Sequence, residues 1–403
     1  MTRRPLSRRA LHLLLAALAV AGVGLWIGFV VSRAGMPELW RRDWYCLYAA
    51  GRAFRTGGAG GLYAGQCAAG YFWLYPPYLL YPYALLSHLT PTSTYALVVV
   101  EIFAATGMAL HFLRRGLQPT STERFQTLAL LVVASAAFNG TVVTGQHSAL
   151  LTAALAGALW ASSRDMPYAA GVFLGVLGLK PNWAIVVIAW LLLTRRWREL
   201  GAMAAVGAVM TAATLPMGFD VWREYVAEAP KVIRGFLDTT SGQPLRKLIT
   251  FEAFSRSTVG RVSPVAAQVV WIGLELLAGF GALVAWTRSR SMADQVAMLV
   301  LVLVAANVYV VFYDALALAI PAAVWWIGRD RYPPRLWWAV GGAAGGLWMW
   351  QWIHLYVPGA AELPSLSGLF LAVWIGAEAL RILIASPGEL AVRSIGAGTA
   401  TAG

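Results

Sequence analysis

The chain has 403 residues, of which 59% are hydrophobic and 12% are charged. This composition excludes an ordinary soluble domain and indicates a polytopic membrane protein whose helices are solvated by lipid or by one another. The formal net charge of +13 could suggest nucleic-acid binding. The basic residues, however, fall in short clusters between apolar runs, as at Arg195, Arg196 and Arg198. We therefore assign the clusters to cytoplasmic loops under the positive-inside rule and expect no nucleic-acid partner.

An apolar run at residues 11–31 is the first predicted transmembrane helix. At 1.5 Å per residue it is about long enough to cross a hydrocarbon core of ~30 Å. Arginines precede it and no small-residue cleavage site follows it, so we predict a retained helix with a cytoplasmic N-terminus.

Further apolar runs predict more spans. With the first, they give an all-α polytopic bundle of about 12 transmembrane helices, in a range of about 10–13 because several runs are short. We expect one membrane-embedded domain over 1–403 and a flexible cytoplasmic tail at 385–403. Outer-face amphipathic helices are expected in two long outer segments, 32–93 and 216–263. The later spans are expected at 94–113, 125–138, 147–160, two short helices that meet at Lys180, 199–215, 264–286, 294–312, 315–327, 336–353 and 365–384.

Polar side chains gather on the outer face of this topology, whereas the arginine clusters fall inside. No Gly-rich phosphate loop, zinc-ligand spacing or Ser-His-Asp arrangement is visible in the sequence. The outer-face polar positions are Asp43, Gln146, Lys180, Tyr313, Asp314 and His354.

A series of short motifs runs in order from about residue 43 to residue 321. Together they resemble glycosyltransferase family 87, whose members are polyprenyl-phosphate-mannose-dependent α-mannosyltransferases of bacteria with a GT-C fold. There are two departures: His147 follows Gln146 where the family has a small polar or aliphatic residue, and the segment 241–246 fits the family's pattern only loosely. The motifs are Asp43 with Tyr45-Cys46-Leu47-Tyr48-Ala49-Ala50-Gly51-Arg52-Ala53, Gly57-Gly58, Leu62-Tyr63, Tyr75-Pro76-Pro77, Gly145-Gln146, Gly171 and Gly175 with Leu179-Lys180-Pro181, Arg195-Arg196-Trp197, and Phe312-Tyr313-Asp314 with Leu316 and Pro321.

The resemblance implies a membrane glycosyltransferase with its active site at the outer face of the bacterial inner (plasma) membrane. It would transfer a hexose, expected to be mannose, from a polyprenyl-phosphate donor to a lipid- or glycan-linked acceptor, with inversion. Such a reaction needs a base for the acceptor hydroxyl and cationic or hydrogen-bonding groups for the departing lipid phosphate. No cofactor is implied with certainty, and no metal ligands are assigned. A divalent cation stays open because Asp314 could help to form a site for one.

Two carboxylates are the catalytic candidates. From its spacing alone, Asp43 is a solvated carboxylate paired with Arg41 or Arg42, whereas the resemblance makes it the general base. Asp314 would assist the base, bind sugar hydroxyls or hold a cation, and its alternative role is a helix N-cap.

Three of the candidates for binding the donor phosphate or the substrate also have an ordinary structural explanation. Lys180 either meets the lipid phosphate or extends to the interface. Gln146 either offers its amide to a sugar hydroxyl or belongs to a polar turn. His354 is a candidate ligand or an interfacial residue. The remaining candidates are Tyr313, Arg52 and Arg246.

Two further pairs of residues, one acidic and one of cysteines, each have two possible roles. Glu101 and Glu275 lie within apolar runs. They would be ion sites in a transporter or flippase of lipid-linked sugars, the rival function, or else buried groups paired with a neighbouring helix. Cys46 and Cys67 are the chain's two cysteines and lie in the same outer loop. They would form a disulfide on an oxidising side of the membrane, or remain buried thiols.

Overall fold

The computed structural model describes residues 43–57, 62–63, 66–67, 71–72, 75–238, 247–307, 309–357 and 363–385. Several predictions fall outside these residues: the first span at 11–31, the pairing of Asp43 with Arg41 or Arg42, the role of Arg246, and the tail beyond residue 385.

Helices make up nearly all of the described chain, as predicted. The exceptions are a small antiparallel hairpin, in which Gln66 pairs with Phe72 and Cys67 with Tyr71, and an isolated bridge between Leu248 and Val311. The elements of the first half are α2 (Asp43–Gly57), β1 (Gln66–Cys67), β2 (Tyr71–Phe72), η2 (Pro77–Leu79), α3 (Leu80–Leu86), α4 (Pro91–Leu117), α5 (Thr122–Val133), α6 (Ala136–Thr144), α7 (Ser148–Ser163), α8 (Pro167–Gly175), η3 (Val176–Leu179), α9 (Pro181–Leu193) and α10 (Trp197–Ala213). Those of the second half are η4 (Leu215–Met217), α11 (Phe219–Asp238), α13 (Phe251–Ser257), η5 (Val259–Arg261), α14 (Pro264–Arg288), α15 (Met292–Ala305), η6 (Phe312–Leu318), α16 (Ala319–Ile327), η7 (Arg329–Arg331), α17 (Pro334–Tyr356) and α18 (Ser367–Ile384).

Within the described residues, four helical segments are long and apolar enough to cross a membrane: α4, α10 continued through η4, α14 and α18. The α5–α6 pair adds a fifth if the two bent helices count as one span. The chain is therefore a multi-pass membrane protein. The larger predicted count of about 12 spans stays a prediction, because the other predicted runs correspond to shorter or more polar helices.

Two predicted spans are not continuous helices. The span at 125–138 is broken into α5 and α6, which are bent by 46°. The break lies at Ser135, whose hydroxyl accepts a hydrogen bond from the Phe138 N–H and so caps a new helix. The span at 294–312 ends at Ala305, and Asn307, two residues further on, accepts a hydrogen bond from the Asn182 side chain at 2.9 Å.

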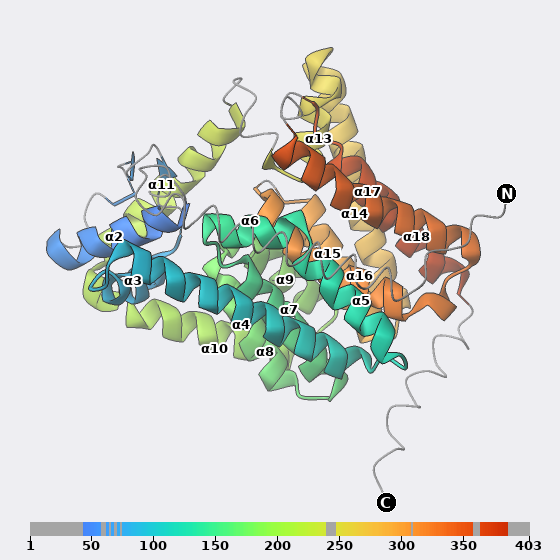
Figure 1. Ribbon diagram of the computed structural model, residues 1–403, viewed down its shortest axis with the longest axis horizontal. Coiled ribbons are helices and arrows are strands. Elements are labelled where there is room, and N and C mark those ends of the chain that lie inside the picture. Colours follow the sequence, from blue (N-terminus) through green and yellow to red (C-terminus); the bar gives the residue numbers. More distant parts are fainter. Residues whose placement is uncertain are drawn as a thin grey trace, which may run out of the picture.

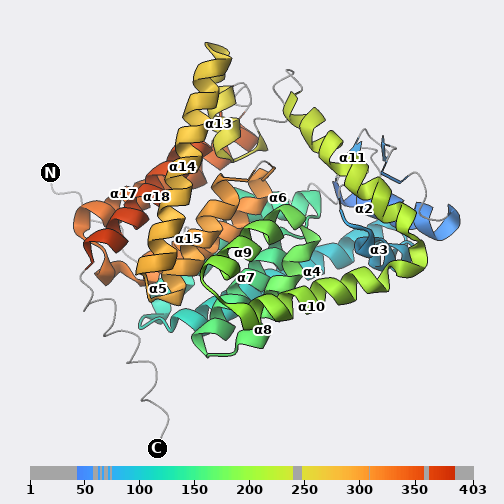
Figure 2. The same cartoon turned by 180° about the vertical axis from the view of Figure 1, so that it is seen from behind.

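The helices form an elongated bundle (Figure 1). The helices α2, α3 and α11 lie at one end, and α14, α17 and α18 lie at the other, in both views (Figure 2). Between the two ends, α4 lies along α7 and α8 along α10. The helix α11 is amphipathic, as predicted for the segment 216–263: Val221 and Ala229 are buried, whereas the side chains of Asp220 and Arg223 are exposed.

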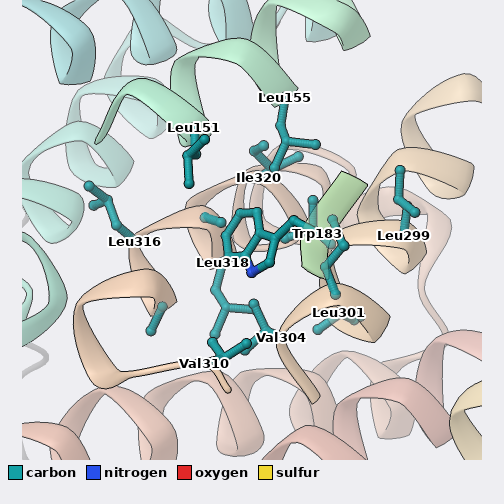
Figure 3. Packing of buried hydrophobic residues seen from close by; sticks show 14 of the residues in the cluster. Leu151, Leu155, Trp183, Leu299, Leu301, Val304, Val310, Leu316, Leu318 and Ile320 are labelled. Carbon is teal, nitrogen blue, oxygen red and sulfur yellow. The ribbon is translucent and has the colours of Figure 1, made fainter. Parts of the chain in front are cut away.

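A dense apolar core fills the middle of the bundle around the indole of Trp183 (Figure 3). Trp183 is fully buried, and its neighbours come from elements far apart in sequence: Leu151 from α7, Leu299 from α15 and Leu316 from η6. Because Trp183 follows Lys180 by one turn of α9, this core holds the start of α9 in place.

Two glycines allow α8 and α10 to approach closely. A Cβ added at Gly171 would lie 2.3 Å from the carbonyl oxygen of Glu199, and one added at Gly175 would lie 2.5 Å from the Cβ of Val206. Small residues four apart permit such contact between membrane helices.

We expect Gly171→Ala to destabilise the protein by about 1–3 kcal/mol, because the new methyl group meets backbone that cannot rotate away. The measurement is thermal unfolding in detergent. Gly207→Ala on α10 is the matched control, since a Cβ there meets nothing within 4 Å. Equal midpoints for the two variants would show that the α8–α10 contact is not tight.

Candidate active site

Asp43 lies in the first turn of α2 and is half-buried. Its Oδ2 atom accepts hydrogen bonds from Gln146 Nε2 at 2.7 Å and from the Tyr313 hydroxyl at 3.3 Å. The helix N-terminus carries a partial positive charge that stabilises a carboxylate. Asp43 is thus an ionisable group fixed by donors from two distant segments of the chain.

The Gly145-Gln146 motif brings Gln146 to Asp43. Gly145 ends α6 with φ at +64°, a left-handed conformation that glycine adopts at little cost. A Cβ at this position would lie 2.4 Å from the Cβ of Trp44, which follows Asp43 in α2. The glycine therefore both turns the chain and leaves room for the start of α2.

Tyr75 completes this side of the site. Its hydroxyl donates to Gln146 Oε1, while Gln146 Nε2 donates to Asp43. Burial raises the pKa of the Tyr75 phenol above its ordinary value, and the nearby Asp43 carboxylate raises that pKa further. The phenol is therefore neutral and acts as a donor.

Lys180 and Asp314 form a buried ion pair on the other side of the site. Lys180 lies between η3 and α9, with its side chain 14% exposed, and Asp314 lies in η6 with no exposed surface. Asp314 also accepts from the Ser148 hydroxyl at 2.7 Å and from the Val311 N–H at 3.0 Å. Instead of extending to the interface, the Lys180 ammonium is bound within the bundle.

The predicted N-cap role for Asp314 is only partly right. Asp314 is the third residue of η6, and its carboxylate reaches back to the backbone N–H of Val311, which is the capping residue. The same carboxylate binds Lys180 and Ser148, so its oxygens serve three donors.

Tyr313 joins the two halves of the site. Its hydroxyl donates to Asp43, and the centroid of its ring lies 5.8 Å from the Lys180 ammonium nitrogen. The Trp183 ring lies 5.4 Å from the same nitrogen. Five of the predicted residues thus form one connected group: Asp43, Gln146, Lys180, Tyr313 and Asp314.

The other predicted site residues lie elsewhere. Arg52 is exposed on α2. It follows Asp43 by nine positions, about two and a half helical turns, and so points away from Asp43's face. His354 is near the end of α17, with its ring 5.9 Å from that of Trp350. Trp352 beside it donates to the carbonyl of Ala134, between α5 and α6, whereas Gln146 follows the far end of α6, about 14 Å away along that helix.

Glu101 and Glu275 both have polar partners. Glu101 Oε2 lies 3.2 Å from His147 Nδ1, and His147 Nε2 lies 2.9 Å from the Tyr83 hydroxyl. Glu275 accepts a hydrogen bond from Trp271 at 2.9 Å. The predicted pairing with a neighbouring helix is right for Glu101, but Glu275 is paired within α14 itself.

Three contributors were not among the predicted site residues: Tyr75, Ser148 and His147. Tyr75 had a signal in the Tyr-Pro-Pro motif, whereas Ser148 carried none.

Cys46, one turn after Asp43, is disulfide-bonded, as predicted for this loop. The chain's one other cysteine is Cys67, whose side chain lies outside the described part of the structure. Across the described residues, no three His, Cys, Asp or Glu side chains are grouped so as to hold a metal ion.

Comparison with known proteins identifies the family. The family model described as Glycosyltransferase family 87 matches residues 73–313, which is more than half of the chain. The chain belongs to glycosyltransferase family 87. The matched segment includes Tyr75, Gln146, Lys180 and Tyr313, ends one residue before Asp314 and does not reach Asp43. This family 87 protein is therefore a membrane glycosyltransferase, an enzyme that uses a sugar donor and an acceptor.

One solved structure similar to this family 87 chain is the crystal structure of ArnT from Cupriavidus metallidurans in the apo state. The sequences are 15% identical, the match covers 91% of this chain and 76% of that one, and the TM-score is 0.37. A TM-score this low does not establish a shared fold. No match was found among curated proteins.

For this family 87 glycosyltransferase we expect Asp314→Asn to lower the free energy of unfolding by about 3–5 kcal/mol, because it leaves the Lys180 ammonium buried without its counter-charge. Asn keeps the shape of Asp, so the loss reports the charge rather than a cavity. The measurement is unfolding in detergent.

Glu228→Gln on α11 is the matched control. It removes one partner of an ion pair whose Lys231 side chain is 69% exposed. Such an exposed pair contributes ~0–1 kcal/mol. An Asp314→Asn loss no larger than the Glu228→Gln loss would contradict a buried pair.

Proposed function

We propose that this glycosyltransferase transfers mannose from a polyprenyl-phosphate donor to a lipid- or glycan-linked acceptor, with inversion at the anomeric carbon. Asp43 is the general base. The observation that carries the proposal is the position of its carboxylate, half-buried in the first turn of α2 and bound by Gln146 and Tyr313.

In the proposed reaction, Asp43 takes the proton of the acceptor hydroxyl, and the resulting oxygen nucleophile forms a bond to the anomeric carbon. The bond between that carbon and the phosphate oxygen breaks, and its electron pair leaves with the polyprenyl phosphate. Negative charge then grows on the phosphate, where a positioned cation stabilises the transition state. Lys180 is our candidate for that cation, since an ammonium has three donor hydrogens and its pairing with Asp314 uses one.

Asp314 acts as a positioning residue in this proposal, and not as a second base. Its side chain is fully buried and its oxygens already accept from Lys180, Ser148 and the Val311 N–H. These contacts fix the Lys180 ammonium near Tyr313, whose hydroxyl binds Asp43. The base is thereby held at the hydroxyl of Tyr313, and the cation is held over the ring of the same tyrosine.

We further propose that the reaction takes place at the outer face of the membrane, in a GT-C bundle of about 12 transmembrane helices. The disulfide at Cys46 supports an outer location for α2, because disulfides persist on the oxidising side of a bacterial inner membrane. The transporter alternative rested on Glu101 and Glu275, and both are engaged with polar neighbours.

The direct test uses purified protein in detergent with polyprenyl-phosphate-mannose as donor and an alkyl mannoside as acceptor probe. Wild type is expected to release polyprenyl phosphate and to form a dimannoside. Asp43→Asn should lower that rate by ~10²–10⁴-fold, since Asn keeps the shape but cannot take a proton.

The control variant is Asp220→Asn, which removes an exposed outer-segment carboxylate paired with Arg223 at 3.6 Å. It should keep the wild-type rate and melting temperature. If Asp43→Asn keeps more than about a tenth of the wild-type rate, which is more than loss of a general base permits, Asp43 is not the base.

A further inference from the structure

Tyr75 lies at the end of a chain of hydrogen bonds that leads to the candidate base. Its hydroxyl donates to Gln146 Oε1, and Gln146 Nε2 donates to Asp43 Oδ2 at 2.7 Å. Tyr75 belongs to the segment before η2, Gln146 follows α6, and Asp43 begins α2. The contact thus links three segments that are distant in sequence.

The two ends of the Gln146 amide have different partners because one end accepts and the other donates. The carboxylate of Asp43 only accepts, so it requires the NH₂ end of the amide. A reversed amide would bring Oε1 against the carboxylate and lose that bond. Tyr75 supplies a donor to Oε1 at the opposite end, so the amide plane is held at two points.

Tyr75 is itself fixed in place. Its carbonyl oxygen accepts from the Tyr63 hydroxyl at 2.9 Å, and its ring lies against that of His147, with centroids 6.2 Å apart and planes nearly perpendicular. Pro76 follows it and restricts its backbone to extended conformations. The phenol therefore presents its hydroxyl to Gln146 from a rigid support.

His147 is also held from two sides. Its ring nitrogens contact the Tyr83 hydroxyl at 2.9 Å and Glu101 at 3.2 Å. These contacts hold the ring beside that of Tyr75. The residue that departs from the family pattern thus supports the phenol that binds Gln146.

We propose that Tyr75 is a positioning residue for sugar transfer, acting on the Asp43 carboxylate through the Gln146 amide. The proposal rests on the proposed role of Asp43 as general base. Catalysis by a base depends on its orientation toward the proton that it takes, and groups that fix this orientation influence kcat more than substrate binding. Gln146 accordingly serves the base in this proposal.

The test is a double-mutant cycle with Tyr75→Phe, Gln146→Met and the two together, using the donor and acceptor probe described above. Methionine keeps the length of glutamine without its amide. Tyr75→Phe should lower kcat about tenfold and leave KM for the donor unchanged, as expected for one lost hydrogen bond at the site. Gln146→Met removes the bond to the carboxylate and should lower kcat about 10- to 100-fold.

The double variant should be no slower than Gln146→Met alone, because Tyr75 acts only through that amide. A merely structural tyrosine predicts instead that the two losses multiply. Multiplied losses, or a rise in KM with unchanged kcat, would overturn the proposal.

Tyr48→Phe is the matched control. Tyr48 is on α2 with Asp43, and its hydroxyl donates to the Leu89 carbonyl at 3.1 Å, away from Gln146. It should keep the wild-type kcat, and a loss as large as that of Tyr75→Phe would count against the proposal.

The proposed function and the role of Tyr75 can fail separately. No transfer by wild type, or full activity of Asp43→Asn, refutes the general base. A wild-type rate in Tyr75→Phe together with an inactive Asp43→Asn refutes only the role of Tyr75.

Discussion

The ion pair between Lys180 and Asp314 is the interaction on which the rest of the site depends. A charge inside an apolar bundle is costly unless a counter-charge and hydrogen bonds compensate it. Asp314 provides the counter-charge, and it also accepts hydrogen bonds from Ser148 and the Val311 N–H. Because these partners come from three different parts of the chain, the pair fixes the break before α9, the start of α7 and the turn into η6 relative to one another. Tyr313, next to Asp314, is thereby aimed at Asp43.

The rigid core and the polar site share the same elements. Trp183 packs in the centre of the bundle, one turn after Lys180, and Leu316 packs beside it, two residues after Asp314 (Figure 3). Apolar packing therefore holds the backbone at both ends of the ion pair. The Asp43 side is held differently, by the Gly145 turn beneath Trp44 and by the hydrogen bonds of Gln146. The two carboxylates of the site thus have distinct environments: Asp314 is fully buried and accepts from three donors, and Asp43 is half-buried at a helix start.

The long membrane helices could be predicted from the sequence within a few residues, since α4, α10, α14 and α18 are uninterrupted apolar runs. The interrupted ones could not, because a single Ser135 or Asn307 ends a helix only when a local cap or a distant partner takes up the freed backbone groups. Likewise, topology places Asp43, Gln146, Lys180, Tyr313 and Asp314 on one face but does not say which of them touch. One of the three donors to Asp314 is Ser148, which has no signal of its own in the sequence. The separation of Arg52 from Asp43, in contrast, was already implied by their spacing along one helix.

The length of chain between Lys180 and Asp314 has a consequence for biosynthesis. The two residues are 134 positions apart, so at roughly 5–20 residues per second the ribosome needs about 7–27 s to make the aspartate after the lysine. During that interval the Lys180 ammonium lacks its counter-charge, and a lysine among apolar helices can extend its side chain toward water instead. The ion pair therefore forms only after η6 has been made, and the N-terminal half of the bundle waits for the C-terminal half before its polar centre can close.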